Sequence, residues 1–186
     1  LASVPAQLQV DLGRLFDEYR QSLLYNADMP ESLNNLGLFQ AGQGDLAGAE
    51  KSLQQARKLA PRYLPALLNL ADIYRARDHD DLGERLLREA SAYYPDSGDV
   101  RHALGLLLVR SGRTAESVRL FEQASRLAPD NAHYALVYAL ALAQSGRRAE
   151  AIEELRVARR RFPGDLPLQQ ALSAYDPSAR ATTTSH

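Results

Sequence analysis

Four prolines stand 34 residues apart along the sequence, at Pro61, Pro95, Pro129 and Pro163. A fixed period of about 20 to 50 residues is typical of repeat architectures, in which each repeat is a small structural unit stacked on the next. Proline cannot continue a helix, so each of these residues is expected where a repeat ends. This phase divides the chain into repeats at residues 30–63, 64–97, 98–131 and 132–165.

Each repeat carries two segments with apolar residues at helical spacing. In the second segment, a small residue is followed four positions later by a large apolar residue, and three positions after that by Ala. The members of this series are Ala49, Leu53, Ala56; Gly83, Leu87, Ala90; Ser117, Phe121, Ala124; and Ala151, Leu155, Ala158. Two antiparallel helices that cross closely need small side chains at their contact, such as Gly37 opposite Ala49. The pattern predicts helices at residues 31–42, 46–58, 65–76, 80–92, 98–110, 114–126, 132–144 and 148–160.

Between the two helices of each repeat, we expect a residue that accepts a left-handed backbone conformation. Gly44, Gly112 and Gly146 supply it in three repeats, and Asp78 takes the place of glycine in the remaining one. The acidic run from Asp78 to Asp81 also has the composition of a metal site. Its position at the start of a helix favours capping instead, because carboxylates stabilise the positive end of the helix dipole.

The pattern resembles the tetratricopeptide repeat over residues 30–165. The tryptophan-type fourth position of that family is filled by Leu33 and Leu67, and it drifts to Arg101 and Ala135 in the later repeats. The resemblance implies an all-α fold, a right-handed α-solenoid of antiparallel helix pairs. It also implies that the first helices line an inner groove that binds protein segments.

The segments outside the four repeats keep the same phase. Residues 1–29 are expected to form an N-terminal helix, an incomplete repeat, in which Leu15, Tyr19 and Ser22 occupy the small-large-Ala positions. A helix without its partner exposes an apolar stripe, which predicts contact with another domain or with a second copy. Residues 166–175 are expected to form a C-terminal capping helix, and residues 176–186 a disordered tail.

Composition excludes several classes of function. The 22 basic and 23 acidic residues give a net charge of −1, so no long-range field attracts nucleic acid or an anionic membrane. The absence of Cys excludes disulfides, thiolate metal sites and covalent haem attachment. No apolar run approaches the roughly 20 residues of a membrane span. Because the sequence begins with Leu rather than Met, we expect it to be a fragment or a processed product.

The inner positions that the resemblance assigns to binding form a mixed groove. They include Asn34, Asn35, Leu38, Leu68, Asn69, Asp72, Arg75, Asp99, His102, Leu106, Val109, Arg110, His133, Leu136 and Leu140. The residues with which some family members clamp a carboxyl terminus are not matched, since Leu38 stands at one of those positions and no Lys or Arg follows at the others. The leucines and Val109 predict instead an apolar track with a few charged contacts, suited to a helix or an extended segment. The alternative is that part of this track packs inside the fold and contacts no partner.

Two histidines offer another interpretation of the groove. His102 and His133, with Asp72 and Asp99 nearby in the repeat pattern, could bind a metal or act as acid and base. Two histidines on a polar groove are more often plain surface residues, and we predict no metal site.

A basic cluster comprises Arg147, Arg148, Arg156, Arg159, Arg160 and Arg161. It could meet phosphate, but no aromatic residues interleave with it. It also lies on and around a second helix, whose outer face is normally solvated. A nucleic-acid partner is therefore disfavoured.

A looser resemblance concerns the protein from which the chain derives. The runs at residues 26–37, 69–75, 102–110 and 134–142 are similar to the C-terminal repeat region of bacterial multihaem c-type cytochromes. This similarity implies a periplasmic location and a haem-binding part outside this chain, which itself lacks the C-x-x-C-H motif. Without the similarity, a cytoplasmic location is expected.

The sequence as a whole predicts a non-catalytic interaction scaffold without a cofactor or metal. Its partner is expected to be a peptide, a helix or a neighbouring domain, and the looser resemblance makes it the assembly module of a larger bacterial envelope protein. One alternative is a self-associating structural module, a homodimer through the terminal helices. The other is a metal-dependent enzyme that uses His102 and His133.

Overall fold

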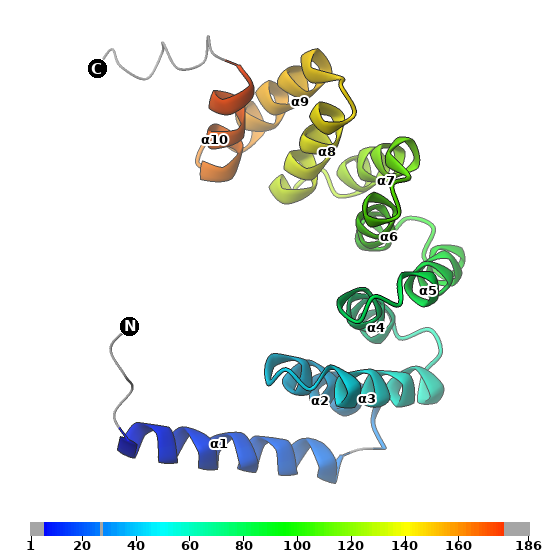
Figure 1. Ribbon diagram of the computed structural model, residues 1–186, viewed down its shortest axis with the longest axis vertical. Helices are drawn as coiled ribbons and strands as arrows, with labels where there is room; N and C mark the ends of the chain where they lie inside the picture. Colours follow the sequence, from blue (N-terminus) through cyan, green and yellow to red (C-terminus); the bar gives the residue numbers. More distant parts are fainter. Residues whose placement is uncertain (1–5, 27, 177–186) are drawn as a thin grey trace. The chain divides into compact units, whose positions relative to one another are not determined.

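The computed structural model describes residues 6–26 and 28–176, which form ten α-helices (Figure 1). They are α1 (Ala6–Tyr25), α2 (Pro30–Gly42), α3 (Leu46–Leu59), α4 (Leu64–Ala76), α5 (Asp80–Tyr93), α6 (Gly98–Arg110), α7 (Thr114–Leu127), α8 (Ala132–Gln144), α9 (Arg148–Arg161) and α10 (Leu166–Tyr175). Each of α2 to α9 begins and ends within one residue of its predicted position. No helix of this described part has the length and apolar character needed to cross a membrane.

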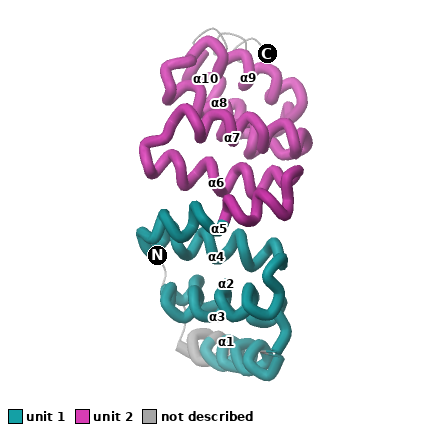
Figure 2. The backbone as a smooth tube through the Cα atoms, turned by 90° about the vertical axis from the view of Figure 1, so that its right-hand side faces the viewer, with its two compact units in different colours: residues 1–86 teal, residues 87–186 magenta. Residues whose placement is uncertain are grey.

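The chain divides into two compact units, residues 1–86 and residues 87–186, with the boundary inside α5 (Figure 2). In the first unit, α2 packs on α1, α3 and α4, and α3 also packs on α4. In the second unit, α7 packs on α6 and α8, while α9 packs on α8 and α10. The predicted all-α fold of consecutive antiparallel helix pairs is confirmed.

The same kind of turn joins the two helices of each pair. Its central residue has a positive φ, which is 83° at Gly44, 58° at Asp78, 71° at Gly112 and 83° at Gly146. The next residue donates its N–H to a carbonyl five positions earlier, as in the 2.9 Å bond from Asp45 to Gln40. This is the Schellman arrangement that ends many helices. The prediction that Asp78 replaces glycine is confirmed, and Asp is among the few residues that adopt this conformation.

Small residues let the paired helices cross closely. A methyl group added at Gly37 would lie 2.7 Å from Leu53 Cγ and 3.2 Å from the carbonyl oxygen of Ala49. One added at Gly105 would lie 2.5 Å from Cε1 of Phe121. Carbon atoms in van der Waals contact normally lie about 3.5–4.0 Å apart, so neither position has room for a side chain. The predicted contact between Gly37 and Ala49 is confirmed.

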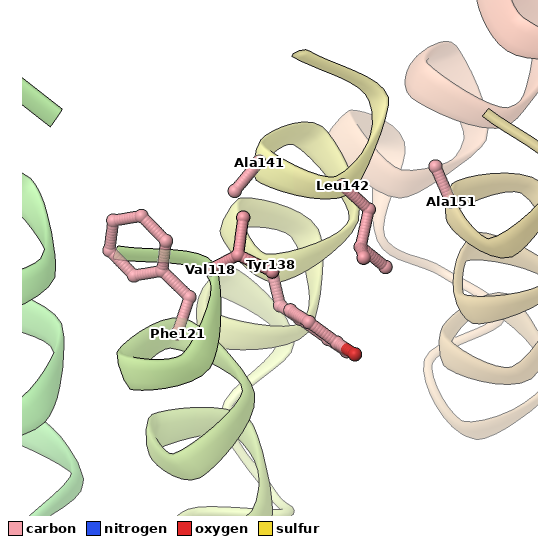
Figure 3. Close-up of a cluster of buried hydrophobic side chains, with 6 residues drawn as sticks. All are labelled: Val118, Phe121, Tyr138, Ala141, Leu142 and Ala151. Carbon is pink, nitrogen blue, oxygen red and sulfur yellow. The ribbon is translucent and has the colours of Figure 1, made fainter. Parts of the chain in front are cut away.

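Two hydrophobic clusters of described residues lie in the second unit. The α7–α9 cluster comprises Val118, Phe121, Tyr138, Ala141, Leu142 and Ala151 (Figure 3). The α10 cluster comprises Ala139, Leu155, Ala158, Leu168 and Leu172. Because burial of apolar area is the main stabilising term in folding, α10 stabilises the unit by covering apolar side chains of α8 and α9.

Polar contacts fix the end of α10 to α9. Arg156 donates to the Asp176 carboxylate at 2.7 Å, and Arg148 donates to the Tyr175 carbonyl oxygen at 2.7 Å. Asp176, the first residue of the predicted tail, is only 6% exposed. Its burial depends on an arginine 20 positions away, which no local pattern reveals. The rest of the predicted tail, residues 177–186, and residues 1–5 and 27 of the predicted N-terminal element lie outside the described residues.

Gly105→Ala is expected to lower the free energy of unfolding. Overpacking against Phe121 costs about 1–3 kcal/mol, which outweighs the gain of up to about 1 kcal/mol in helix propensity. Gly13→Ala is the matched control, because Gly13 lies in α1 and no neighbouring atom lies within 4 Å of the added methyl group. Urea denaturation followed by circular dichroism measures both changes. A Gly105→Ala protein as stable as the wild type would contradict the close crossing.

Candidate interaction surface

The residues predicted to contact a partner lie on the first helices of the pairs. In the first unit, Asn34, Asn35 and Leu38 lie on α2, and Leu68, Asn69, Asp72 and Arg75 lie on α4. In the second unit, Asp99, His102, Leu106, Val109 and Arg110 lie on α6, and His133, Leu136 and Leu140 lie on α8. We call these two groups the α2–α4 surface and the α6–α8 surface.

Three amides link α2 to α4. Asn69 Nδ2 donates to Asn34 Oδ1 at 2.8 Å, and Asn34 Nδ2 donates to Asn35 Oδ1 at 3.4 Å. Asn34 is buried, with 4% of its surface exposed, whereas Asn35 is exposed. Buried polar groups are almost always hydrogen-bonded, and here the bonds of Asn34 position its two neighbours. Asn35 and Asn69 are therefore the amides of this surface that can reach a bound segment.

An exposed leucine and an ion pair complete the α2–α4 surface. Leu38 is 47% exposed, whereas Leu68 is half-buried. Arg75 pairs with Asp72, three residues earlier on the same helix, at 3.0 Å. Such exposed pairs contribute about 0–1 kcal/mol, so either charge can exchange this partner for a charged group of a bound segment.

The apolar side chains of the α6–α8 surface differ in their burial. Val109 is 43% exposed. Leu106 packs against the α7–α9 cluster, and Leu136 packs against the α10 cluster. Leu140 is half-buried, and Arg110 is exposed. The alternative that part of the track packs inside the fold therefore applies to Leu106 and Leu136.

An aromatic group links α6 to α8. The His102 ring stacks on Tyr134, with 4.7 Å between the ring centroids and 24° between the planes, and its centroid lies 5.3 Å from that of His133. The Tyr134 hydroxyl donates a hydrogen bond to the Asp99 carboxylate. Burial and this negatively charged acceptor raise the pKa of Tyr134 well above its ordinary value of 10.0. Tyr134 is thereby kept neutral as the donor that ties the two helices together.

Sequence reasoning misses Tyr134, but a signal for it exists. Asn34 and Asn69 are 35 residues apart, and so are Asp99 and Tyr134. Two polar residues separated by one repeat plus one residue thus form a hydrogen bond between the first helices of successive pairs. A search for hydrogen-bonding residues at this spacing would have found both pairs.

His102 and His133 are the candidate metal ligands of the groove. Among residues 6–26 and 28–176, no three His, Cys, Asp or Glu side chains are placed to hold a metal ion. Asp99, one of the two carboxylates expected near the histidines, accepts the hydrogen bond of Tyr134. The metal-dependent enzyme has no ligand set in this described part of the chain.

The basic cluster of α9 makes contacts within the molecule. Arg147 pairs with Glu150 at 2.7 Å, and this hydrogen-bonded arginine lowers the pKa of Glu150. Arg161 donates to the carbonyl oxygen of Pro129 at 2.9 Å. The contacts of Arg148 and Arg156 with the end of α10 favour a structural role for these two arginines, whereas the exposed Arg147–Glu150 pair contributes only about 0–1 kcal/mol.

The acidic run before α5 has the geometry of a helix start. Asp80 and Asp81 lie in the first turn of α5, and Asp81 pairs with Arg85 at 3.3 Å. Carboxylates at this position interact favourably with the helix dipole. The arrangement agrees with the capping interpretation.

Antiparallel helix pairs joined by a recurring turn define a helical-repeat protein. One family model of the tetratricopeptide repeat matches residues 102–165, and another matches residues 40–107. Together they span residues 40–165, which is more than half of the chain. The chain belongs to the tetratricopeptide repeat family. This fold is generally a protein–protein interaction module and is typically non-catalytic.

Several solved structures share the fold. TTC0263, a tetratricopeptide repeat (TPR) protein of Thermus thermophilus, is 22% identical with a TM-score of 0.73, over 91% of this chain and 95% of that one. MamA of Desulfovibrio magneticus RS-1 is 17% identical with a TM-score of 0.65, over 82% and 96%. YrrB, a TPR protein with an unusual peptide-binding site, is 14% identical with a TM-score of 0.63, over 89% and 85%. These identities show the fold alone.

A search of curated protein sequences finds no match. The matching family models describe tetratricopeptide repeats, so the similarity to multihaem cytochromes stays a prediction.

Tyr134→Phe is expected to change the stability of the protein at alkaline pH. The folded-state pKa of Tyr134 lies above the ordinary value of 10.0, so above about pH 10 the unfolded chain loses this proton first and the free energy of unfolding falls. Removing the phenol should make that fall shallower. Urea denaturation at several pH values measures the slope. Tyr25→Phe, which alters a side chain that is 90% exposed, serves as the control, and an unchanged slope in Tyr134→Phe would contradict the buried hydrogen bond.

Proposed function

We propose that the chain is a non-catalytic scaffold that binds partner polypeptide on the α2–α4 surface and on the α6–α8 surface. The observation that carries the proposal is the exposure of apolar side chains on helices whose other sides are buried. Leu38 is 47% and Val109 43% exposed, whereas Leu36 and Leu108 on the same helices are 4% and 0% exposed. Covering such side chains contributes about 25 cal/mol per Å² of apolar area.

The α2–α4 surface suits an extended peptide. Asn35 and Asn69 each carry a donor and an acceptor, which match the alternating C=O and N–H groups of an extended backbone. The 2.8 Å bond from Asn69 to Asn34 orients the amide of Asn69 before binding, which reduces the entropy lost on association. Leu38 adds an apolar contact one helical turn from Asn35. The expected ligand is an extended segment with an apolar side chain at that point.

The α6–α8 surface suits an apolar segment with an acidic residue. Val109 is exposed and Leu140 is half-buried, and Arg110 adds a positive charge at the end of α6. A carboxylate of the partner can pair with this guanidinium. An amphipathic helix provides apolar side chains on one face and a carboxylate at its edge.

The partner need not be a separate protein. The similarity to the C-terminal repeat region of multihaem cytochromes supports a neighbouring domain of the same parent protein as the partner. On this proposal, the chain is the assembly module of a larger protein of the bacterial envelope.

Peptides selected from a displayed library against the wild-type protein provide probes for both surfaces, and fluorescence anisotropy measures their affinity. Leu38→Glu and Val109→Glu are expected to weaken the binding of these peptides at least about tenfold, because each change puts a charge where an apolar contact would be desolvated. Asn69→Ala should weaken the binding of those peptides whose affinity depends on Leu38, since it removes a hydrogen-bonding amide.

Leu59→Glu and Leu127→Glu are the matched controls. These leucines are 49% and 39% exposed but lie on the second helices α3 and α7. Both controls should keep wild-type affinity. If selected peptides bind Leu38→Glu and Val109→Glu as tightly as the wild type, the binding surface lies elsewhere.

A further inference from the structure

Helix α1 packs on α2 but leaves several large apolar side chains about half exposed or more. Leu23 is 7% exposed, and the rings of Phe16 and Tyr19 lie 5.9 and 5.7 Å from the ring of Phe39 on α2. Yet Leu15 is 60%, Tyr19 49% and Phe16 45% exposed. With Phe39 and Glu18, these side chains line a surface pocket of about 540 Å³. We call Leu15, Phe16, Tyr19 and Phe39 the α1 face.

The repeat period identifies what this face corresponds to. Leu15 and Tyr19 stand 34 residues before Ala49 and Leu53, where the second helix of a pair contacts the first. The small-large-Ala positions are 0%, 1% and 0% exposed in α3, 0%, 2% and 1% in α7, and 0%, 0% and 4% in α9. In α1, the first two of these positions are 60% and 49% exposed. Among the described residues no first helix covers these positions, so the α1 face corresponds to the same contact with its first-helix side open.

We propose that the α1 face binds an amphipathic α-helix of a partner polypeptide, in the place that a first helix takes in the other pairs. The equivalent contacts define its chemistry, since Leu53 packs on Gly37 and Phe121 packs on Gly105. The bound helix carries apolar residues at helical spacing and a small residue where it crosses Tyr19. Leu15 replaces a small residue of the other pairs, so the bound helix also needs a small side chain opposite Leu15.

The charges beside the α1 face favour a helix over a lipid surface. Arg14, Asp17, Glu18 and Arg20 are all exposed, and Arg20 pairs with Asp17 at 3.3 Å. Helices that lie on anionic membranes have an excess of Lys and Arg on the polar face. The described part of α1 has balanced charges, so apolar contact is the main attraction.

The test uses the full chain and a fluorescent peptide with the sequence of residues 63–77, the α4 segment, as the probe helix. Wild-type protein should bind it, and Leu15→Glu and Tyr19→Glu should each weaken binding at least about tenfold, because they place a charge in the apolar contact. Tyr25→Glu is the matched control, since it adds the same charge to the same helix at a side chain that is 90% exposed and outside the α1 face. Circular dichroism checks that the variants keep their helices.

A free peptide must fold as it binds, so a linked helix supplies the second measurement. A copy of residues 30–45, joined directly to residue 12 so that it replaces residues 1–11, keeps the 34-residue spacing. This graft should raise the midpoint of thermal unfolding by at least about 2 °C, and the same graft with Leu36→Asp in the copied helix should not. The proposal fails if Leu15→Glu and Tyr19→Glu do not weaken peptide binding and the graft raises the midpoint no more than its Leu36→Asp version does. Light scattering provides a further check. If the wild-type protein is a dimer that Leu15→Glu abolishes and the peptide does not disrupt, a second copy of the chain covers the α1 face and the proposal is overturned.

Discussion

The close crossing of the two helices in each pair is the contact on which the other features depend. Where Gly37 and Gly105 lack a side chain, Leu53 and Phe121 pack directly against the first helix. The crossing sets the distance between the helices, and the Schellman turn sets their direction. Each pair can then present one first helix whose outward residues recur at a constant spacing. Groups such as Asn34 and Asn69 meet because this geometry repeats.

The helices are predictable from the sequence because local chemistry sets their ends. A proline or a residue with a positive φ follows the end of each helix from α2 to α9, and Asp78 is recognisable only because it falls at the glycine position of the period. The polar contacts of Tyr134 and Asp176 are not predictable in this way. Each depends on a partner in another helix, and neither residue belongs to the apolar pattern that reveals the fold.

The candidate surface is predictable in position but not in exposure. The period places every predicted residue on a first helix, yet Leu38 and Val109 are exposed while Leu106 and Leu136 pack against the hydrophobic clusters. Their burial depends on how the neighbouring helices cover them, and α10 contributes to the cluster beside Leu136. The arginines of α9 illustrate the same limit, because a run of positive charge in the sequence becomes a set of bonds to carbonyl and carboxylate oxygens.

The α1 face has a consequence for the lifetime of the protein as well as for its partners. Most helices pack on their neighbours in the sequence, so each pair can form from short-range contacts, and such chains fold rapidly. Opening is equally local, and it requires least free energy where apolar contacts are fewest. In the first unit that place is α1, which packs mainly on α2. Proteolytic cleavage of the first unit should therefore start there, and the lifetime of this unit depends on whether α1 is covered rather than on the average stability of its pairs.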